Sequence, residues 1–241
     1  GWLPKSLTDL LAIAAFLGYE FKGEVLFGLV HSNYLEGLAK PEMTKLEFLS
    51  HLTRARKEGL VETTGGPQHN SAEHDGSSFP RYKFSHDKVQ QALYVSLVDT
   101  NAQLMHRAIG LYLWDVEGES AGMEVADHLN LSEPNAVEKS LLCEVNYAAA
   151  KIARTRQSYR LSTKYLNNAV RLLGPNKWTE QYHCSLEMST LLLDLYIACG
   201  NSAAVETVVS EVSEHARCLE DKLPVMLCKI IFLGSHSLYA K

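Results

Sequence analysis

The sequence predicts a mainly α-helical protein in which one small β-hairpin follows the first helices. Apolar residues recur at i, i+3, i+4 and i+7 over most of the 241 residues, as on the buried face of a helix. Between residues 60 and 84 the apolar residues instead alternate, as in strands, on either side of a polar, Gly/Ser-rich segment. From about residue 100 onward only the helical pattern returns. These three observations favour two domains.

The composition excludes several classes of protein. Hydrophobic residues make up 46% of the chain and charged residues 21%, as in an ordinary globular protein. The net charge of −5 makes nucleic acid an unlikely partner, because generic binders of phosphates are basic. No apolar run is long enough to span a membrane, so no membrane partner is expected. The 5 cysteines form no C-x-x-C pair, which favours a reduced, cytoplasmic protein.

Residues 1–99 are predicted to form a winged-helix domain. Helices are expected at residues 6–17, 21–30 and 42–57, and strands at residues 60–64 and 79–84. Ser6 is expected to cap the first helix and Gly18 to stop it. The buried face of the third helix is expected to consist of Met43, Leu46, Leu49 and Leu52. Three helices followed by a hairpin is the order of a winged helix.

Residues 100–241 are predicted to form paired helices. The segments LNNAVRLLGPN (166–176) and LYIACGNSAAVETVV (195–209) resemble parts of tetratricopeptide repeats. Ala169 and Val212 would then be equivalent, 43 residues apart, with a long junction around Trp178. Because such repeats bury their apolar faces against neighbours, we expect an uncovered face near Lys241, where the array is expected to be truncated.

Two longer stretches resemble a family of signalling proteins. They are YKFSHDKVQQALYVSLVD at residues 82–99 and the segment at residues 148–201. Both are similar to the winged-helix and repeat region of signal-transduction (STAND) ATPases of the AAA superclass, found in large serine/threonine or hybrid histidine kinases. The resemblance implies a non-catalytic regulatory segment that couples the nucleotide state of an upstream domain to partner binding or kinase output. It implies that this chain holds no cofactor. It also implies a longer parent protein that is an ATPase and a kinase and that binds ATP or ADP with Mg.

The segment Phe84-Ser85-His86-Asp87 lies where the expected hairpin passes into a helix. It is similar to the Met-His-Asp motif of related signalling ATPases, whose histidine contacts the β-phosphate of ADP. The resemblance implies that His86 senses the phosphate and that Asp87 orients it or caps the helix. The alternative is that Asp87 only caps the helix and His86 packs at the hairpin base. A phospho-accepting histidine is rejected, because no proline follows before Leu97 and no nucleotide-binding glycine box is present.

A winged-helix transcription regulator that binds DNA is the alternative function. Its basic residues would be Lys45, Arg54, Arg56, Lys57, Arg81 and Lys83. Four glutamates, Glu42, Glu47, Glu58 and Glu62, lie among them. Because phosphate contacts need surplus positive charge, these basic residues favour a solvated, ion-paired surface over a DNA-binding one.

Two further groups of residues were considered as sites. His69, His74 and Asp75 lie in the Gly/Ser-rich segment, without the scaffold that a metal site needs, so no metal is expected. No catalytic constellation is present, so we expect no enzymatic activity in this chain. Six aromatic residues follow the repeat helices: Tyr147, Tyr159, Tyr165, Trp178, Tyr182 and Tyr196. They would either pack between helices or line a groove for a protein or peptide partner, for which Tyr159, Tyr165, Trp178 and Tyr196 are the candidates. A plain protein-interaction scaffold without nucleotide coupling is the remaining alternative.

Overall fold

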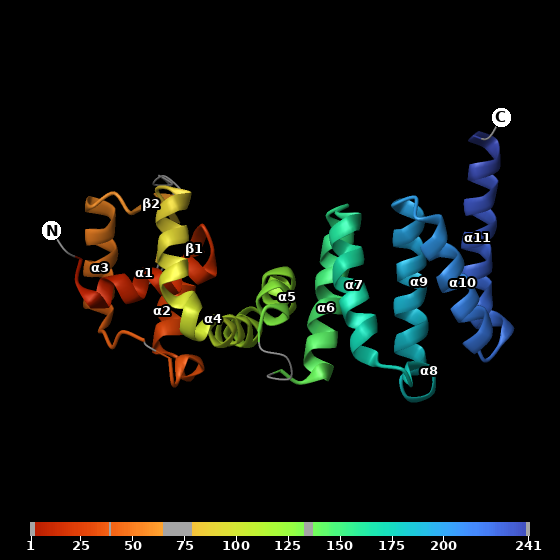
Figure 1. Cartoon of the computed structure of the whole chain (residues 1–241), viewed down its shortest axis with the longest axis horizontal. Helices are drawn as coiled ribbons and strands as arrows, with labels where there is room; N and C mark the ends of the chain where they lie inside the picture. Colours follow the sequence, from red (N-terminus) through yellow and green to blue (C-terminus); the bar gives the residue numbers. More distant parts are fainter. Residues whose placement is uncertain (1–2, 39, 65–78, 133–136, 240–241) are drawn as a thin grey trace, which may run out of the picture. The chain divides into compact units, whose positions relative to one another are not determined.

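The computed structural model describes residues 3–38, 40–64, 79–132 and 137–239. Within these ranges the chain is mainly helical, with one three-stranded antiparallel sheet (Figure 1), which confirms the predicted fold class. Its contacts divide it into two compact units, Gly1–Glu117 with Leu131–Ala136 and Gly118–Asn130 with Val137–Lys241. The boundary between the two units therefore lies after Glu117, whereas the sequence predicted a boundary after residue 99. Over the described ranges no helix combines the length and apolarity needed to cross a bilayer.

The first unit has the element order expected of a winged helix, with one strand more than predicted. Its elements are α1 (Lys5–Leu17), β1 (Glu20–Lys22), α2 (Gly23–His31), η1 (Asn33–Leu35), α3 (Lys45–Lys57), β2 (Val61–Thr64), β3 (Arg81–Phe84) and α4 (Asp87–Glu117). The strand β3 is central, because Tyr82 pairs with Phe21 of β1 and with Thr63 of β2. The additional strand β1 has three residues, too few for an alternating pattern to be visible in the sequence.

The helix α1 lies at the centre of the first unit and is buried over most of its length. It begins at Lys5, and the amide groups of Leu7 and Thr8 donate hydrogen bonds to the carbonyl oxygen of Pro4. The predicted cap at Ser6 is therefore wrong; the Ser6 hydroxyl lies 3.1 Å from His51 Nε2 instead. The predicted stop is confirmed, because Gly18 has a φ of 132°, which glycine adopts without strain.

Of the residues predicted to form the buried face of α3, Leu52 is confirmed, but Leu46 and Leu49 are not. Phe48, Leu52 and Ala55 point into the core, whereas Leu46 is 79% exposed and Leu49 is 37% exposed. The helix begins at a capping box, in which the Thr44 hydroxyl accepts from the Glu47 amide and the Glu47 carboxylate accepts from the Thr44 amide. Both sets of apolar residues have helical spacing, so periodicity alone did not distinguish them.

The helix α4 changes direction sharply, as Figure 1 shows. Tyr94 Oη lies 3.1 Å from His106 Nε2, although two residues twelve apart would be about 18 Å apart along a straight helix. The ring of Phe16 from α1 packs against both, with centroid distances of 4.3 Å to Tyr94 and 5.3 Å to His106. Burial lowers the pKa of His106, so this cluster holds a neutral imidazole. The boundary expected after residue 99 falls inside this helix.

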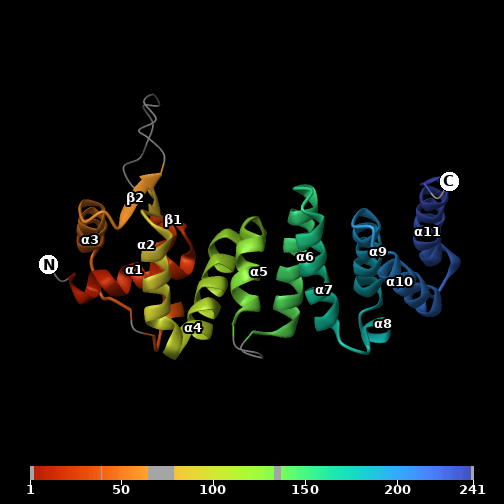
Figure 2. The same ribbon diagram turned by 45° about the horizontal axis from the view of Figure 1, so that its top comes forward.

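The second unit consists of helices with a regular spacing. Its elements are η2 (Gly118–Ala121), α5 (Gly122–Asn130), α6 (Lys139–Thr155), α7 (Tyr159–Leu173), α8 (Lys177–Glu180), α9 (Tyr182–Ala198), α10 (Ser202–His215) and α11 (Leu219–Tyr239). Both α6 and α9 have 17 residues and start 43 residues apart, the same offset that separates the starts of α7 and α10. In Figures 1 and 2, α6 lies beside α7 and α9 beside α10. The predicted 43-residue spacing of two helix pairs is confirmed.

The short helix α8 fills the junction that the sequence predicts around Trp178. The Trp178 indole donates a hydrogen bond to Glu211 Oε1 at 2.9 Å and stacks on His215 of α10. Lys177 Nζ lies 2.7 Å from the same Glu211 oxygen. Burial would raise the pKa of Glu211, but the hydrogen bonds from Lys177 and Trp178 outweigh it and the pKa is lowered. The junction therefore ties α8 to α10.

Candidate protein-binding groove

A cleft with a volume of about 540 Å³ lies in the second unit, between α6, α9 and α11. These are the first helices of the two pairs and the helix that follows them. The lining residues are Tyr147, Lys151 and Arg154 of α6; His183, Leu186, Glu187, Thr190, Leu191 and Asp194 of α9; and Glu220, Asp221 and Pro224 of α11. Their spacing of three or four residues along α6 and α9 places them on one face of each helix. We call this cleft the α6–α9–α11 groove.

Side-chain pairs that cross the floor of the groove join α6 to α9. The Tyr147 hydroxyl donates a hydrogen bond to Glu187, and Arg154 Nη2 lies 3.0 Å from Asp194 Oδ2. Lys151 Nζ lies 4.7 Å from the centroid of the Tyr147 ring. Burial, together with the hydrogen bond to Glu187, raises the pKa of the Tyr147 hydroxyl, which therefore stays a donor. The floor of the groove is therefore held in one geometry by contacts within the chain.

The opposite wall of the groove is anionic. The Tyr182 hydroxyl donates to the Asp221 carboxylate and accepts from the Arg217 amide at 2.9 Å. The hydrogen bond from Tyr182 lowers the pKa of Asp221, which stays ionised. A hydrogen bond from its own backbone amide likewise lowers the pKa of Glu220. Two carboxylates therefore stand at the start of α11.

The groove has an uneven distribution of charge. Lys151 and Arg154 are its cationic residues and both belong to α6, whereas the four carboxylates belong to α9 and α11. The four carboxylates and the two cations together carry a net charge of −2. Apolar surface is supplied by Leu186, Leu191 and Pro224. The volume lies within the range of ligand-binding clefts, about 300–1,000 Å³, and the lining is mainly polar and charged.

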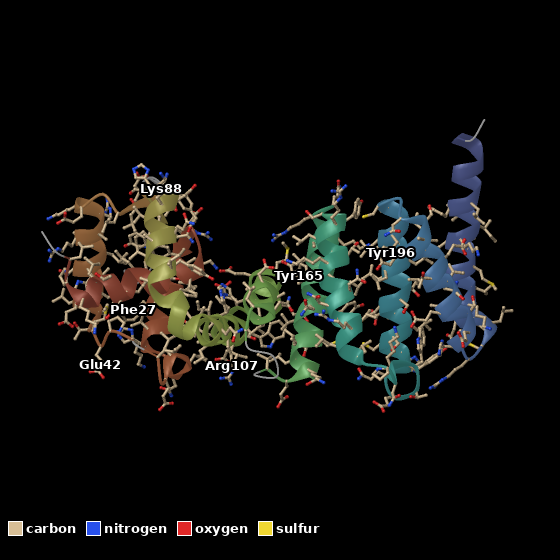
Figure 3. The ribbon with its side chains drawn as sticks, viewed as in Figure 1. Phe27, Glu42, Lys88, Arg107, Tyr165 and Tyr196 are labelled. Carbon is tan, nitrogen blue, oxygen red and sulfur yellow. The ribbon has the colours of Figure 1, made fainter. Side chains whose placement is uncertain are left out.

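The four aromatic residues predicted to bind a partner lie elsewhere. Tyr165 is fully buried, and its hydroxyl donates to Asp127 Oδ1 of α5 at 2.8 Å (Figure 3). Trp178 is 7% exposed and packs in the junction described above. Both are corrected to packing residues, because a buried side chain has no surface for a partner. Tyr159 is 40% exposed, and Tyr196 is half-buried with its hydroxyl 2.8 Å from Asn167 Oδ1.

Tyr147, one of the six aromatic residues considered in the sequence, does line the groove. It shares one exposed or half-buried stripe of α6 with Lys151 and Arg154. Polar and aromatic residues that share a stripe on a repeat helix indicate a binding face better than aromatic residues alone. Glu187 and Asp194 carry no such signal, because they approach from the next helix pair.

His86 directly precedes α4, whose first turn contains Lys88, labelled in Figure 3. The amide of Val89 donates to the His86 carbonyl oxygen at 3.0 Å, so His86 is the residue just before the first turn. The side chains of His86 and Asp87 are exposed, so the alternative in which His86 packs at the hairpin base is wrong. Within the described ranges, the neighbouring Ser85 hydroxyl is buried without a hydrogen-bond partner.

The basic residues of the DNA-binding alternative face solvent among acidic groups. Lys45, Arg54, Arg56 and Lys57 are exposed on α3. On the hairpin, Lys83 Nζ lies 3.1 Å from Glu62 Oε2, and the hydrogen bond between them raises the pKa of Lys83. This pairing neutralises part of the positive charge that DNA phosphates would require.

The metal-ligand candidates His69, His74 and Asp75 lie outside the described residues. Where the structure does describe the chain, no three His, Cys, Asp or Glu side chains are grouped to hold a metal ion.

No protein-family model, curated protein or solved structure matches the chain. The feature that bears most directly on function is therefore the α6–α9–α11 groove.

Proposed function

We propose that the chain is a regulatory interaction segment without catalytic activity, whose second unit binds a short extended segment of a partner protein. The observation that supports the proposal is the α6–α9–α11 groove. The helices α6, α9 and α11 present to it a preformed surface of apolar, aromatic and charged side chains. Helical repeat proteins use the surface formed by equivalent helices of successive repeats in this way.

The charges of the groove define the chemistry of the partner segment. The Arg154–Asp194 and Tyr147–Glu187 pairs fix the floor, while Glu220 is exposed at the wall. A bound segment with arginine or lysine next to apolar residues would place its cation near Glu187 and Glu220 and its apolar side chains on Leu186 and Pro224. Complementary charge of this kind contributes to specificity and to the association rate.

Selection of short peptides from a phage-displayed random library tests this proposal. We expect the selected peptides to combine basic and apolar residues. Glu187→Lys should raise their dissociation constant about tenfold, the equivalent of about 1.4 kcal/mol. Glu187 is exposed, so the variant is expected to fold. Isothermal titration calorimetry on the purified chain measures the change.

The matched control is Glu214→Lys, the same charge reversal at an exposed position of α10 outside the groove. It should leave the dissociation constant of the selected peptides within about twofold, because screening weakens interactions between separated surface charges. Equal effects of the two variants, or selected peptides without basic residues, would contradict the proposal.

We further propose that, in a signalling ATPase of the type that the sequence resembles, this segment couples the nucleotide state of an AAA-type domain to partner binding or kinase output. The exposed His86 side chain at the start of α4 supports this role, because helix N-termini and imidazoles both favour phosphate.

In a protein that joins such a domain to this segment, His86→Ala should speed ADP release about tenfold, and Lys88→Ala much less. An unchanged rate of ADP release in the His86 variant would contradict the proposal that His86 senses the phosphate of ADP.

The DNA-binding alternative receives less support. Its basic side chains lie beside glutamates, and one of them, Lys83, is already paired with Glu62. A surface of this kind lacks the surplus of cations that displaces counterions from a duplex. We therefore retain protein binding as the proposed function.

A further inference from the structure

The segment of residues 145–179 has a charge opposite to that of the whole chain. It holds 7 of the 23 lysine and arginine residues and none of the 28 acidic residues, although the chain has a net charge of −5. It covers most of α6, all of α7 and most of α8. Positive charge is therefore concentrated in one part of the second unit, while the other basic residues are spread among all the acidic ones.

Four polar residues of this segment form one exposed face of α7. They are Arg160, Lys164, Asn167 and Arg171, and all four are exposed. Their spacing of i, i+4, i+7 and i+11 places them within an arc of about 60° and over a length of about 16 Å. We call this surface the α7 cationic face. It is separate from the α6–α9–α11 groove, to which α7 contributes no lining residue.

Contacts within the chain leave most of the charge on the α7 cationic face available. Among the described residues, no carboxylate pairs with Arg160 or with Arg171, whose Nη2 lies 3.4 Å from Asn168 Oδ1. Lys164 Nζ lies 3.8 Å from Asp127 Oδ1, and the two side chains are 61% and 55% exposed. An ion pair as exposed as this one holds its partners weakly.

The stability of α7 does not explain why Arg160 is basic. Arg160 lies in the first turn of α7, where the helix dipole favours acidic residues and disfavours cations, and that turn contains no acidic residue. The like charge of Lys164 at i+4 is also unfavourable for the helix. Arg171, in the last turn, does agree with the dipole. A local conflict of the kind seen at Arg160 is expected at functional sites.

We propose that the α7 cationic face binds an acidic segment of a partner protein, whose carboxylates accept hydrogen bonds from Arg160 and Arg171. The planar guanidinium group matches the two oxygens of a carboxylate. Arg160 and Lys164 are about 6 Å apart along the helix, as are acidic residues at i and i+4 of a second helix. A nucleic acid fits less well, because the face is short and the rest of the chain is acidic.

The probe is a fluorescein-labelled, alanine-based peptide whose glutamates recur at the i, i+4, i+7 and i+11 spacing of the α7 cationic face. We expect saturable binding to the full chain by fluorescence anisotropy at low ionic strength, and weaker binding as salt is added. In the Arg160→Glu/Arg171→Glu chain the dissociation constant should rise about tenfold or more. Both residues are exposed, and glutamate in the first turn agrees with the helix dipole, so this variant is expected to fold.

The matched control is Arg54→Glu/Lys57→Glu, which reverses two exposed charges on α3 and gives the chain the same net charge as the α7 variant. It should leave the dissociation constant within about twofold, because screening weakens interactions between separated surface charges. Peptides bound in the α6–α9–α11 groove should be unaffected by the α7 variant, which separates this test from that of the proposed function.

Four results would overturn the proposal. The first is no peptide binding at millimolar concentration, and the second is an equal effect of the α3 and α7 variants, since net charge alone would then govern binding. The third is tighter binding of a single-stranded DNA oligonucleotide that the α7 variant abolishes, because the face would then be a nucleic-acid site. The fourth is a chain that sediments as a dimer and becomes a monomer in the α7 variant, because a second copy would then supply the carboxylates.

Discussion

Replacing Tyr165 by alanine is expected to lower the free energy of unfolding of the second unit by about 3–5 kcal/mol, the range for truncation of a buried aromatic side chain. The side chain is fully buried between helices, so its loss leaves a cavity. The change also removes the hydrogen bond from the hydroxyl to Asp127, which joins α7 to α5. Urea denaturation followed by circular dichroism measures the difference.

Two further variants separate the contributions of Tyr165. Tyr165→Phe keeps the ring and loses the hydroxyl, for an expected cost of about 1 kcal/mol. Tyr159→Ala is the matched control, because Tyr159 lies on the same helix with its side chain 40% exposed. It should change the free energy of unfolding by less than about 0.5 kcal/mol. If the alanine variants of Tyr159 and Tyr165 were equally stable, the corrected packing role of Tyr165 would be wrong.

Replacing Gly28 by alanine is expected to destabilise the first unit by about 1–3 kcal/mol, as overpacking does. Gly28 lies inside α2, where alanine would ordinarily add about 1 kcal/mol of stability. Here, however, the new Cβ would overlap the hydroxyl of Tyr112 from α4, and Tyr112 Cζ would be only 3.0 Å away. The close approach of α2 to α4 therefore requires glycine. Thermal or urea unfolding of the single variant measures the cost.

A double-mutant cycle identifies the cause of that cost. In a Tyr112→Phe background the overlapping hydroxyl is absent, so Gly28→Ala should be less destabilising by about 1 kcal/mol. Glu24→Ala, an exposed change on the same helix, should have an effect below about 0.5 kcal/mol. A stabilising Gly28→Ala, or one that costs the same in both backgrounds, would show that the two helices do not approach closely at Gly28.

Much of the fold could be predicted because helical periodicity is strong and local. The 43-residue offset of the helix pairs follows from apolar stripes and from turns such as Gly200-Asn201. The missed features depend on tertiary contacts. The α3 stripe of Phe48, Leu52 and Ala55 competes with an equally periodic stripe that contains Leu46. The bend of α4 depends on Phe16, Tyr94 and His106, which come together only after folding.

The candidate site was less predictable than the fold. Arg154 and Asp194 carry no motif, and they approach one another only because α6 and α9 occupy equivalent places in successive pairs. The aromatic residues chosen from the sequence, Tyr165 and Trp178, are large and follow helical spacing, which describes packing residues equally well. Burial distinguishes the two roles, and it is a property of the folded chain.

Backbone hydrogen exchange of the chain, with and without a library-selected peptide, locates the site at which the partner segment binds. We expect the peptide to slow exchange in α6, α9 and the first turns of α11, while α3, β2 and the start of α4 exchange at unchanged rates. Slowed exchange confined to α3 and β2, or to the start of α4 at His86, would contradict this expectation, because the partner would then bind the first unit and not the α6–α9–α11 groove.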